Sequence, residues 1–336
     1  MAVLVSGGMG YIGSHTTVEL LNAGFDVVIA DDLSNSKELV KDRIEKITGK
    51  TTKFYNVDLT NEEEAEKVFL ENDIDSVIHF AAFKAVGESV EKPLEYYYNN
   101  ITSALVMLRL MRKYDCKNFV FSSSATVYGD AKVVPITEDS PLSATNPYGR
   151  TKLMIEDMLR DIAKADPTLN IAILRYFNPV GAHKSGTIGE DPNGIPNNLM
   201  PYITKVAVGE LKQLRVFGND YPTHDGTGVR DYIHVVDLAN GHVKALEKLQ
   251  TNPGLVTYNL GTGKGYSVLD VVKAFAEASG RDIPYEIVDR RPGDIATCYA
   301  DPKVANEELG WSAERGIKEM CEDSWRWQSN NPKGYN

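Results

Sequence analysis

Short apolar segments alternate with segments of helical periodicity through the first half of the chain. The apolar segments are rich in residues that favour β-strands, and they cover 3–6, 26–30, 53–57, 76–81, 118–122 and 171–174. Two intervening segments carry apolar residues at the spacing of one buried helical face, namely Ile101, Ala104, Leu105, Leu108 and Met111, then Ile155, Met158, Leu159 and Ile162. This alternation predicts an α/β fold with a doubly wound parallel sheet.

The pattern changes near residue 178. From 178 to 232 the chain is rich in Gly, Pro, Asn and Asp yet keeps apolar residues, which is typical of irregular, ligand-holding loops. Beyond it, 268–279 predicts a helix and 283–288 a short strand. We therefore expect residues 1–178, rejoined by part of 230–262, to form the sheet domain. Residues 179–336 would form a smaller mixed domain, with a cleft between the two.

The composition of the chain argues against two classes of binding partner, nucleic acids and membranes. The 336 residues include 36 Lys and Arg against 47 Asp and Glu, a net charge of −11. Such an acidic chain lacks the basic surface that nucleic acids and anionic membranes require, and no apolar run reaches the ~18 residues of a membrane span. Three scattered cysteines, Cys116, Cys298 and Cys321, suit a reducing compartment. We expect a cytoplasmic protein that binds neither nucleic acid nor membrane.

A glycine-rich turn follows the first expected strand. Gly7, Gly10 and Gly13 are spaced so that the backbone can turn tightly and approach a pyrophosphate at the N-terminus of the next helix. The second strand leads into Asp31, where a carboxylate accepts hydrogen bonds from a ribose 2′-hydroxyl and repels a 2′-phosphate. Asp32 adds to that repulsion. These features predict a Rossmann-like domain that binds NAD rather than NADP.

A tyrosine and a lysine share one face of a later helix. Asn146 and Pro147 are typical of a helix start, and Tyr148 and Lys152 follow at i and i+4. A lysine there can hold the ribose of NAD while its charge favours the tyrosinate, although moving a phenol pKa from about 10 to about 7 requires roughly 4 kcal/mol. Ser124 follows an expected strand, so its hydroxyl is expected at the same edge of the sheet.

Longer motifs indicate the type of enzyme. The features above are followed, in order, by the motifs Arg175–Gly181, Gly194–Pro201 and Gly228–His234. Together they resemble the UDP-glucose 4-epimerase family of the extended short-chain dehydrogenases/reductases, from Ala2 to Gln328. The resemblance implies an isomerase of galactose metabolism that epimerises UDP-galactose and UDP-glucose reversibly at C4, through a transient 4-keto sugar and NADH. It also implies a homodimer, formed by a helix bundle that includes the helices bearing Leu105 and Met158.

The resemblance assigns roles to individual residues. Tyr148 would take the proton from the sugar 4-hydroxyl, Ser124 would assist it, and Lys152 would hold the nicotinamide ribose. Further matching cofactor positions are Tyr11, Ile12, Asn35, Asp58, Phe80, Lys84, Asn99 and Phe177. Beside Ser124 and Tyr148, the matching UDP-sugar positions are Asn178, Asn198, Leu199, Phe217, Arg230, Tyr232, Arg291, Asp294 and Cys298. Of these, Arg230 and Arg291 can bind the diphosphate oxygens, and Phe217 can lie against the uracil.

Other functions on the same scaffold are alternatives. A nucleotide-sugar 4,6-dehydratase needs an extra acid and base to eliminate water, and Ala125 and Thr126 stand where related enzymes carry carboxylates. A UDP-uronate 4-epimerase stays open, whereas a non-catalytic NAD sensor would have no use for the serine, tyrosine and lysine together. Cys298 stands where some family members carry tyrosine, so UDP-GlcNAc and UDP-GalNAc are further candidate substrates. The histidines, His79, His183, His224 and His234, show no ligand spacing with carboxylates or cysteines, so no metal is expected.

Overall fold

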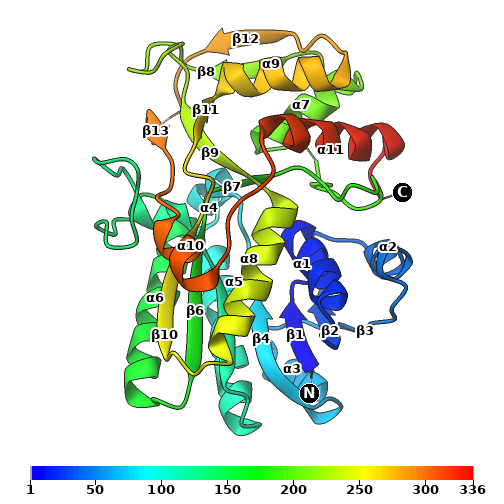
Figure 1. The fold of residues 1–336 in the computed structure, drawn as a ribbon, viewed down its shortest axis with the longest axis vertical. Coiled ribbons are helices and arrows are strands. Elements are labelled where there is room, and N and C mark those ends of the chain that lie inside the picture. The colour runs from blue at the N-terminus through cyan, green and yellow to red at the C-terminus, as the bar shows by residue number, and fades with distance from the viewer. Residues whose placement is uncertain (1, 195, 292, 336) are drawn as a thin grey trace.

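Seven parallel strands form the larger sheet. The computed structural model describes residues 2–194, 196–291 and 293–335, so Met1, Ile195, Pro292 and Asn336 lie outside the described residues. The strands are β1 (Ala2–Ser6), β2 (Val27–Asp31), β3 (Lys53–Asn56), β4 (Ile74–His79), β5 (Asn118–Ser124), β6 (Asn170–Tyr176) and β10 (Leu255–Leu260). Their order in space is β10-β6-β5-β4-β1-β2-β3 (Figure 1). The predicted doubly wound parallel sheet is confirmed, and all six strands predicted in the first half are present.

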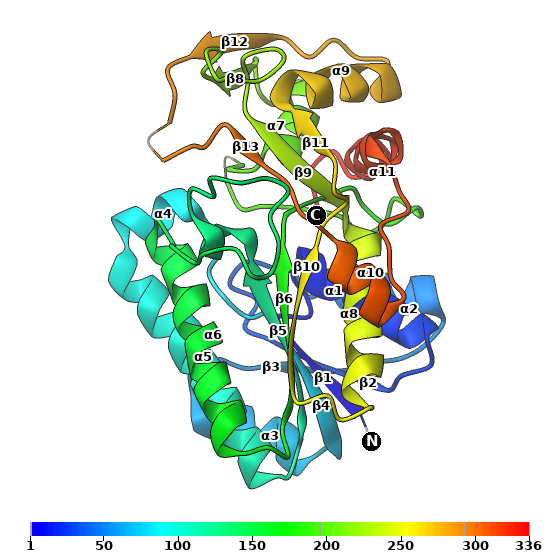
Figure 2. The ribbon, with the colours of Figure 1, turned by 60° about the vertical axis from the view of Figure 1, so that its left-hand side comes forward.

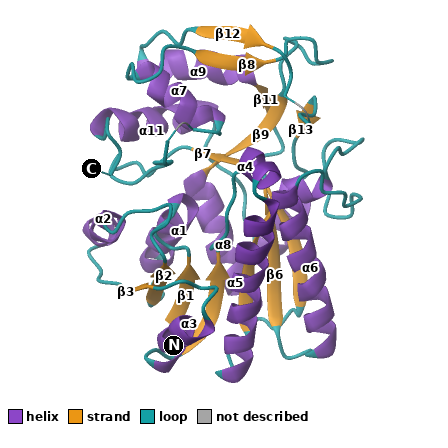
Figure 3. Ribbon diagram, turned by 180° about the vertical axis from the view of Figure 1, so that it is seen from behind, coloured by secondary structure: helices purple, strands orange, loops and turns teal. Residues whose placement is uncertain are grey.

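Helices cover both faces of this sheet, because successive side chains of each strand point to opposite faces. Val3 and Val5 lie in one hydrophobic core and Leu4 in the other. The first core includes residues of α1 (Tyr11–Asn22), α2 (Leu39–Thr48), α8 (Val235–Leu249) and α10 (Lys303–Leu309). The second includes residues of α3 (Glu62–Leu70), α5 (Pro93–Lys113) and α6 (Pro147–Ala165). Figure 3 shows α5 and α6 side by side over the second face, with the short α4 (Val86–Glu91) above them.

The predicted buried stripe on α5 is wrong at one position. Ala104 and Met111 are buried as expected, but the Leu105 side chain is 41% exposed. The helix packs inward through Ser103, Ala104 and Met107, so Leu105 points past the edge of the core. The stripe is wider than the surface that the sheet covers, and part of it faces solvent.

A smaller set of strands and helices covers the carboxyl edge of the large sheet. Three short strands pair with β9 (Val229–His234), namely β7 (Asn178–Val180), β11 (Gly265–Ser267) and β13 (Thr297–Cys298). A second pair joins β8 (Leu214–Phe217) to β12 (Tyr285–Val288). The helices here are α7 (Leu199–Ala207), α9 (Val268–Ser279) and α11 (Ile317–Asn330). The predicted helix has the observed bounds of α9, while the supposedly irregular 178–232 segment also contains β7, α7, β8 and most of β9.

The chain crosses from the smaller part back to the larger sheet. After β9 it continues into α8, which packs against α1, and then into β10, which pairs with β6 (Figure 2). No helix in the described part of the chain is long and apolar enough to span a membrane.

The strand order places a ligand site at one point of the sheet. The chain runs outward from β1 through β2 to β3, then returns to β4 on the other side of β1. The loops after β1 and β4 therefore diverge, which leaves a crevice at their carboxyl ends where open α/β sheets bind ligands. The glycine turn follows β1, and Phe80 and Lys84 follow β4.

Candidate active site

A cavity of about 560 Å³ opens at this crevice. It gathers most of the predicted cofactor residues from the ends of β1, β2, β4 and from α5 and α6. Those that line it are Gly7, Gly10, Tyr11, Ile12, Gly13, Asp31, Asn35, Asp58, Phe80, Lys84, Asn99, Tyr148 and Lys152, together with the predicted sugar residue Asn198. The fold thus brings together predicted residues that are up to 191 positions apart along the chain, from Gly7 to Asn198.

Each of the three positions in the turn favours glycine for a different physical reason. Gly7 has φ +72°, a conformation that favours glycine, and a Cβ there would lie 2.8 Å from the backbone nitrogen of Ala81. A Cβ on Gly13 would lie 2.2 Å from the Gly7 carbonyl oxygen. At Gly10 the nearest protein atom would be 3.3 Å away, and this residue lines the cavity. Its small size therefore leaves room for a ligand rather than for the protein itself.

The N-terminus of α1 points its free amides into the same space. Gly10 is the N-cap of α1 and no side chain caps the first turn, which carries no acidic residue. Such a helix end attracts a phosphate group. The residues present therefore fit the pyrophosphate of a dinucleotide.

Asp31 is held at the end of β2 by local hydrogen bonds. Its carboxylate accepts from the amides of Met9 (3.0 Å) and Leu33 (2.9 Å) and from the Ser36 hydroxyl (2.7 Å). Burial raises the pKa of Asp31 above its ordinary value, while these bonds act to lower it. A carboxylate has about four acceptor positions, so one remains to receive a ribose hydroxyl.

The predicted serine, tyrosine and lysine come from two adjacent elements. Ser124 ends β5 and caps the 3₁₀ turn Ala125–Tyr128, its hydroxyl accepting from the Thr126 amide at 3.2 Å. Asn146 caps α6 as predicted, accepting from the Gly149 amide at 2.8 Å. A Cβ on Gly149 would lie 3.1 Å from the Thr126 carbonyl oxygen, so α6 begins directly against the turn that follows Ser124.

The electrostatics of this group differ from the sequence-based expectation. Burial raises the pKa of the Tyr148 phenol, and hydrogen bonding with Ser124 acts in the opposite direction. Lys152 is 2% exposed, and burial lowers its pKa to about 7. Its ammonium donates to the Ser122 carbonyl at 2.6 Å and lies 6.0 Å from the centre of the Tyr148 ring. The lysine is therefore aimed at the strand end beside the tyrosine, and burial makes deprotonation of the phenol harder than it is in water.

A buried ion pair that the sequence did not reveal fixes α6 to the sheet. Glu156 lies one turn after Lys152, is fully buried, and receives two hydrogen bonds from the Arg175 guanidinium, at 3.0 and 2.7 Å. Ser123 donates to the same carboxylate at 2.6 Å. Burial acts to raise the pKa of Glu156, but Arg175 and Ser123 hold it below its ordinary value. The sequence gives no signal for this group of residues 123, 156 and 175. They meet only because β5 and β6 pair in a register that places Ser123 beside Arg175.

Four of the predicted sugar residues form a second group, on the smaller sheet. Arg230 and Tyr232 are two apart on β9 and point to one face. Cys298 of β13 is in register with Arg230, and Asn178 of β7 is in register with Tyr232, so all four share that face. Burial raises the pKa of Tyr232 to about 12 although Arg230 and a second arginine act to lower it.

That second arginine is Arg291, which comes from the loop after β12. Its guanidinium carbon lies 4.6 Å from the centre of the Phe217 ring, and its Nε pairs with Asp294 at 3.1 Å. Leu199 is the first residue of α7, directly after Asn198. Two guanidinium groups and an aromatic ring thus lie together in a chain of strongly negative net charge, as the sequence suggested.

Several predicted residues do not line the cavity. They are Ser124, Phe177, Asn178, Leu199, Phe217, Arg230, Tyr232, Arg291, Asp294 and Cys298. Phe177 and Cys298 instead belong to a small hydrophobic core with Tyr128 and Ile136, and burial raises the pKa of the Cys298 thiol to about 11. The cavity and the face of the smaller sheet are separate features of the structure.

Sequence reasoning missed one loop that lines the cavity. Residues Gly189–Asn193 and the distant Tyr335 contribute to its wall. The Glu190 carboxylate pairs with Lys84 at 3.3 Å and accepts from Asn198 at 3.2 Å. Asp191, Pro192 and Asn193 match the loop composition noted in the sequence, which was the one available signal.

Two of the histidines that show no ligand spacing along the sequence lie beside carboxylates in the structure. His224 Nε2 lies 3.2 Å from Asp270 and 3.7 Å from Asp225, and His234 Nε2 lies 3.2 Å from Asp323. Asp270 and Asp323 lie more than 40 positions from the histidines that they contact, so spacing along the sequence could not show these two pairs. His224 is exposed and its two carboxylate partners are half-buried, whereas the His234 pair is buried.

Comparison with known proteins agrees with this geometry. The family model described as GDP-mannose 4,6 dehydratase matches residues 4–324. The chain is 64% identical over 335 residues to the UDP-glucose 4-epimerase of Bacillus subtilis, covering all of this chain and 99% of that protein. It is 63% identical over 336 residues to the enzyme of that name from Haemophilus influenzae, with the same coverage. The structure matches UDP-glucose 4-epimerase from Bifidobacterium longum, solved with NAD⁺ and UDP, with a TM-score of 0.97, 58% identity, and coverage of 99% of this chain and 100% of that one.

Proposed function

The chain belongs to the UDP-glucose 4-epimerase family, and from that premise we propose that it interconverts UDP-glucose and UDP-galactose with NAD as its resident cofactor. The observation that carries this proposal is the placement of Tyr148 and Lys152 on the wall of the cavity that the glycine turn and Asp31 also line. When bound, NAD supplies the chemistry of removing hydride from C4 of the sugar and returning it. The reaction is an isomerisation, so the cofactor leaves the cycle unchanged.

Side chains of the protein itself carry out the proton transfer. As the phenolate, Tyr148 takes the proton from the 4-hydroxyl, and as the phenol it returns that proton when hydride comes back to C4, with Ser124 hydrogen bonding to it. Because burial raises the phenol pKa, the proton is held firmly on Tyr148 until opposite charge is nearby. Lys152 is within reach to supply part of that charge, and its pKa of about 7 lets it titrate near neutral pH.

The second group of residues suits the nucleotide part of the substrate. We assign the diphosphate to Arg230 and Arg291, the uracil to Phe217 and a ribose hydroxyl to Asp294. The shared face of β9, β13 and β7 supports this assignment. With it we propose the domain division stated above, a cofactor domain of 1–178 with part of 230–262 and a UDP-sugar domain of 179–336. The return of α8 and β10 to the larger sheet supports that division.

The small side chain of Cys298 suits an enzyme that accepts a wider range of UDP-sugar substrates. It shares its sheet face with Arg230 and is a small side chain on the edge strand β13. A tyrosine there would extend a ring into the space that an N-acetyl group at C2 needs, whereas a thiol leaves that space free. We therefore propose that UDP-GlcNAc and UDP-GalNAc are also interconverted.

An exposed apolar stripe suits a homodimer. On α5, Leu94, Tyr98 and Leu105 follow at i, i+4 and i+11 and are 76%, 63% and 41% exposed, and Met154 of the adjacent α6 is 44% exposed. Exposed apolar groups that lie together in this way mark interaction sites, and two copies would cover them as a four-helix bundle. Leu105→Glu should shift the protein to a monomer by light scattering. A wild type that is monomeric at micromolar concentration would exclude this dimer.

We place the protein in the cytoplasm. Its three cysteines are free and buried in the structure, and the chain is acidic. A reducing compartment suits a chain of this kind.

The function is tested by analysing the purified protein and its activity together. Denatured protein should release NAD, and intact protein should convert UDP-galactose to UDP-glucose without added cofactor, measured by chromatographic separation of the two nucleotide sugars. A coupled UDP-glucose dehydrogenase assay, which itself requires added NAD, then gives the rates. UDP-glucuronate is the comparison substrate, because its turnover in place of UDP-galactose would favour the uronate epimerase. Release of NADP alone, or no turnover of any UDP-sugar, would exclude the proposal.

A further inference from the structure

One loop, Gly189–Asn193, which we call the strap, crosses the cavity. All five of its residues line the cavity wall. At one side Glu190 pairs with Lys84, which follows β4. At the other side the Asn193 side-chain amide donates to the Asn35 side chain (3.2 Å) and the Ser34 carbonyl (3.4 Å), both after β2. Because β1 lies between β4 and β2, the strap passes above the glycine turn that follows β1.

The outer contacts of the strap are weak by themselves. The Lys84 side chain is 48% exposed, so its pair with Glu190 is screened by water and contributes little. The contacts of Asn193 are also exposed. Another interaction must therefore keep the strap across the cavity.

Tyr335 supplies that interaction from the segment after α11. Its hydroxyl accepts from the Gly189 amide at 3.0 Å and donates to the Gly189 carbonyl at 3.1 Å. Its own amide donates to Asp191 at 2.9 Å. Tyr335 is 9% exposed, so these bonds are sheltered from water, and both hydrogen-bonding groups of Gly189 depend on a single phenol.

A second aromatic residue packs the same end of the strap. The Trp327 ring lies 4.6 Å from the Tyr335 ring, and its indole nitrogen donates to the Glu190 carbonyl at 3.2 Å. A Cβ on Gly189 would lie 2.3 Å from the Trp327 ring. The strap therefore reaches this site only because residue 189 is glycine.

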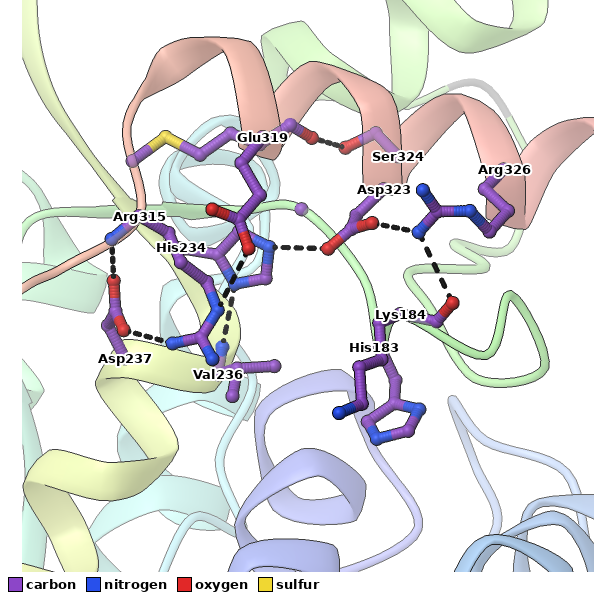
Figure 4. Close-up of polar contacts among 12 residues, drawn as sticks. His183, Lys184, His234, Val236, Asp237, Arg315, Glu319, Asp323, Ser324 and Arg326 are labelled. Carbon is purple, nitrogen blue, oxygen red and sulfur yellow. Dashed lines mark hydrogen bonds and ion pairs between the residues drawn. The ribbon is translucent and has the colours of Figure 1, made fainter.

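Helix α11, which carries Trp327 and precedes Tyr335, is itself firmly anchored (Figure 4). Arg315, just before it, pairs with Asp237 in the first turn of α8, and the amides of Glu314 and Arg315 donate to the same carboxylate. Asp323 pairs with the buried His234 at 3.2 Å and with Arg326, whose guanidinium also donates to the Lys184 carbonyl. Tyr335 thus fixes the strap to a rigid part of the molecule.

We propose that Tyr335 is a positioning residue that keeps the strap over the bound cofactor and so sets how slowly NAD leaves. This rests on the proposed function, because it assumes that the cavity holds NAD. An epimerase regenerates its cofactor in each turnover, so slow release costs it nothing. The exposed outer contacts open easily, and the buried contacts of Tyr335 return the strap to its place.

The test compares the release of NAD from holoprotein variants. Tyr335→Phe keeps the ring and removes both hydrogen bonds to Gly189, and Tyr285→Phe is the matched control at an exposed tyrosine of β12. Bound NAD is exchanged against excess isotopically labelled NAD and followed by rapid filtration. We expect release from Tyr335→Phe to be at least roughly fivefold faster than from wild type and control, as for the loss of a buried hydrogen bond. Its activity should also come to depend on added NAD.

The outcomes separate this inference from the proposed function. If wild type releases NAD on denaturation but Tyr335→Phe exchanges it at the wild-type rate, the role of Tyr335 is wrong and the function stands. If Tyr335→Phe loses activity that added NAD does not restore, the residue only supports folding and the proposal also fails. If wild type carries no dinucleotide, the proposed function itself fails.

Discussion

The two glycines at the start of α1 give a sharp test of the cofactor site. Gly10 has φ −69° and ψ 174°, which any residue adopts, and an added Cβ would meet only the Gly7 carbonyl at 3.3 Å. A Cβ on Gly13 would overlap the same oxygen at 2.2 Å and the Gly8 Cα at 2.8 Å. Gly10→Ala should therefore preserve the fold and occupy ligand space, whereas Gly13→Ala should disturb the turn itself.

The expected magnitudes follow from these distances. A hydrogen bond to a charged group contributes about 1.5–3 kcal/mol, so displacing one backbone contact to the pyrophosphate lowers NAD affinity about 10- to 100-fold. A 100-fold loss removes about 2.7 kcal/mol of the stabilisation that saturating NAD gives to the folded state. Without NAD, Gly10→Ala should change the free energy of unfolding by less than about 1 kcal/mol. Gly13→Ala should lose roughly 1–3 kcal/mol through overpacking.

Thermal unfolding with and without added NAD measures both effects on the same samples. The NAD content of each purified variant, per subunit, gives an independent measure of retention. The reasoning would be refuted if Gly10→Ala kept wild-type NAD content and the wild-type thermal shift. It would also be refuted if Gly13→Ala were as stable as wild type without NAD, since that outcome would mean the turn tolerates the Cβ.

Three further predictions concern the proton, acid stability and the sugar. Tyr148→Phe should lower kcat about 10²–10⁴-fold in the coupled assay while NAD content is retained, and near-normal turnover would remove Tyr148 from its role. Burial lowers the pKa of His79 to about 3, so the unfolded chain binds more protons below pH 6.5 and stability falls as the pH drops. Urea unfolding should show that His79 lowers the free energy of unfolding by about 2 kcal/mol at pH 5. In His79→Gln this part of the decrease should be absent. Cys298→Tyr should keep UDP-galactose turnover and lose UDP-GalNAc turnover, and a wild type inactive on UDP-GalNAc would contradict the proposal.

The sheet was predictable because its signals are local. Each strand of the first half is a short apolar run, and parallel strands buried on both faces need little more than that. The smaller part gave weaker signals, since β7, β11 and β13 have only two or three residues and pair with a central strand far away in the chain. Leu105 shows a related limit, because periodicity gives the apolar face of a helix but not how much of it the sheet covers.

The same distinction holds for the candidate site. The glycine turn, Asp31 and the Tyr148–Lys152 pair were predictable because each is a short motif at the start or end of one element. The Glu156–Arg175 pair, the His224 group and the contact of Tyr335 with Gly189 were not, because each joins residues that only the tertiary fold brings together. The pKa of Tyr148 also depends on burial, which the sequence does not give.

The two sides of the site differ in how readily a single substitution can change its specificity. The cofactor side is built from the ends of central strands, where Gly13 and Gly7 have backbone within 3 Å of any added atom. Substitution there disturbs the sheet as well as the ligand. Cys298 instead lies on a two-residue strand that pairs only at the edge of β9, and its neighbours are side chains of a small separate core. Under the proposed assignment of the sugar site, a larger residue at 298 would alter the space for the sugar and repack this small core, while the seven strands of the larger sheet stay in place.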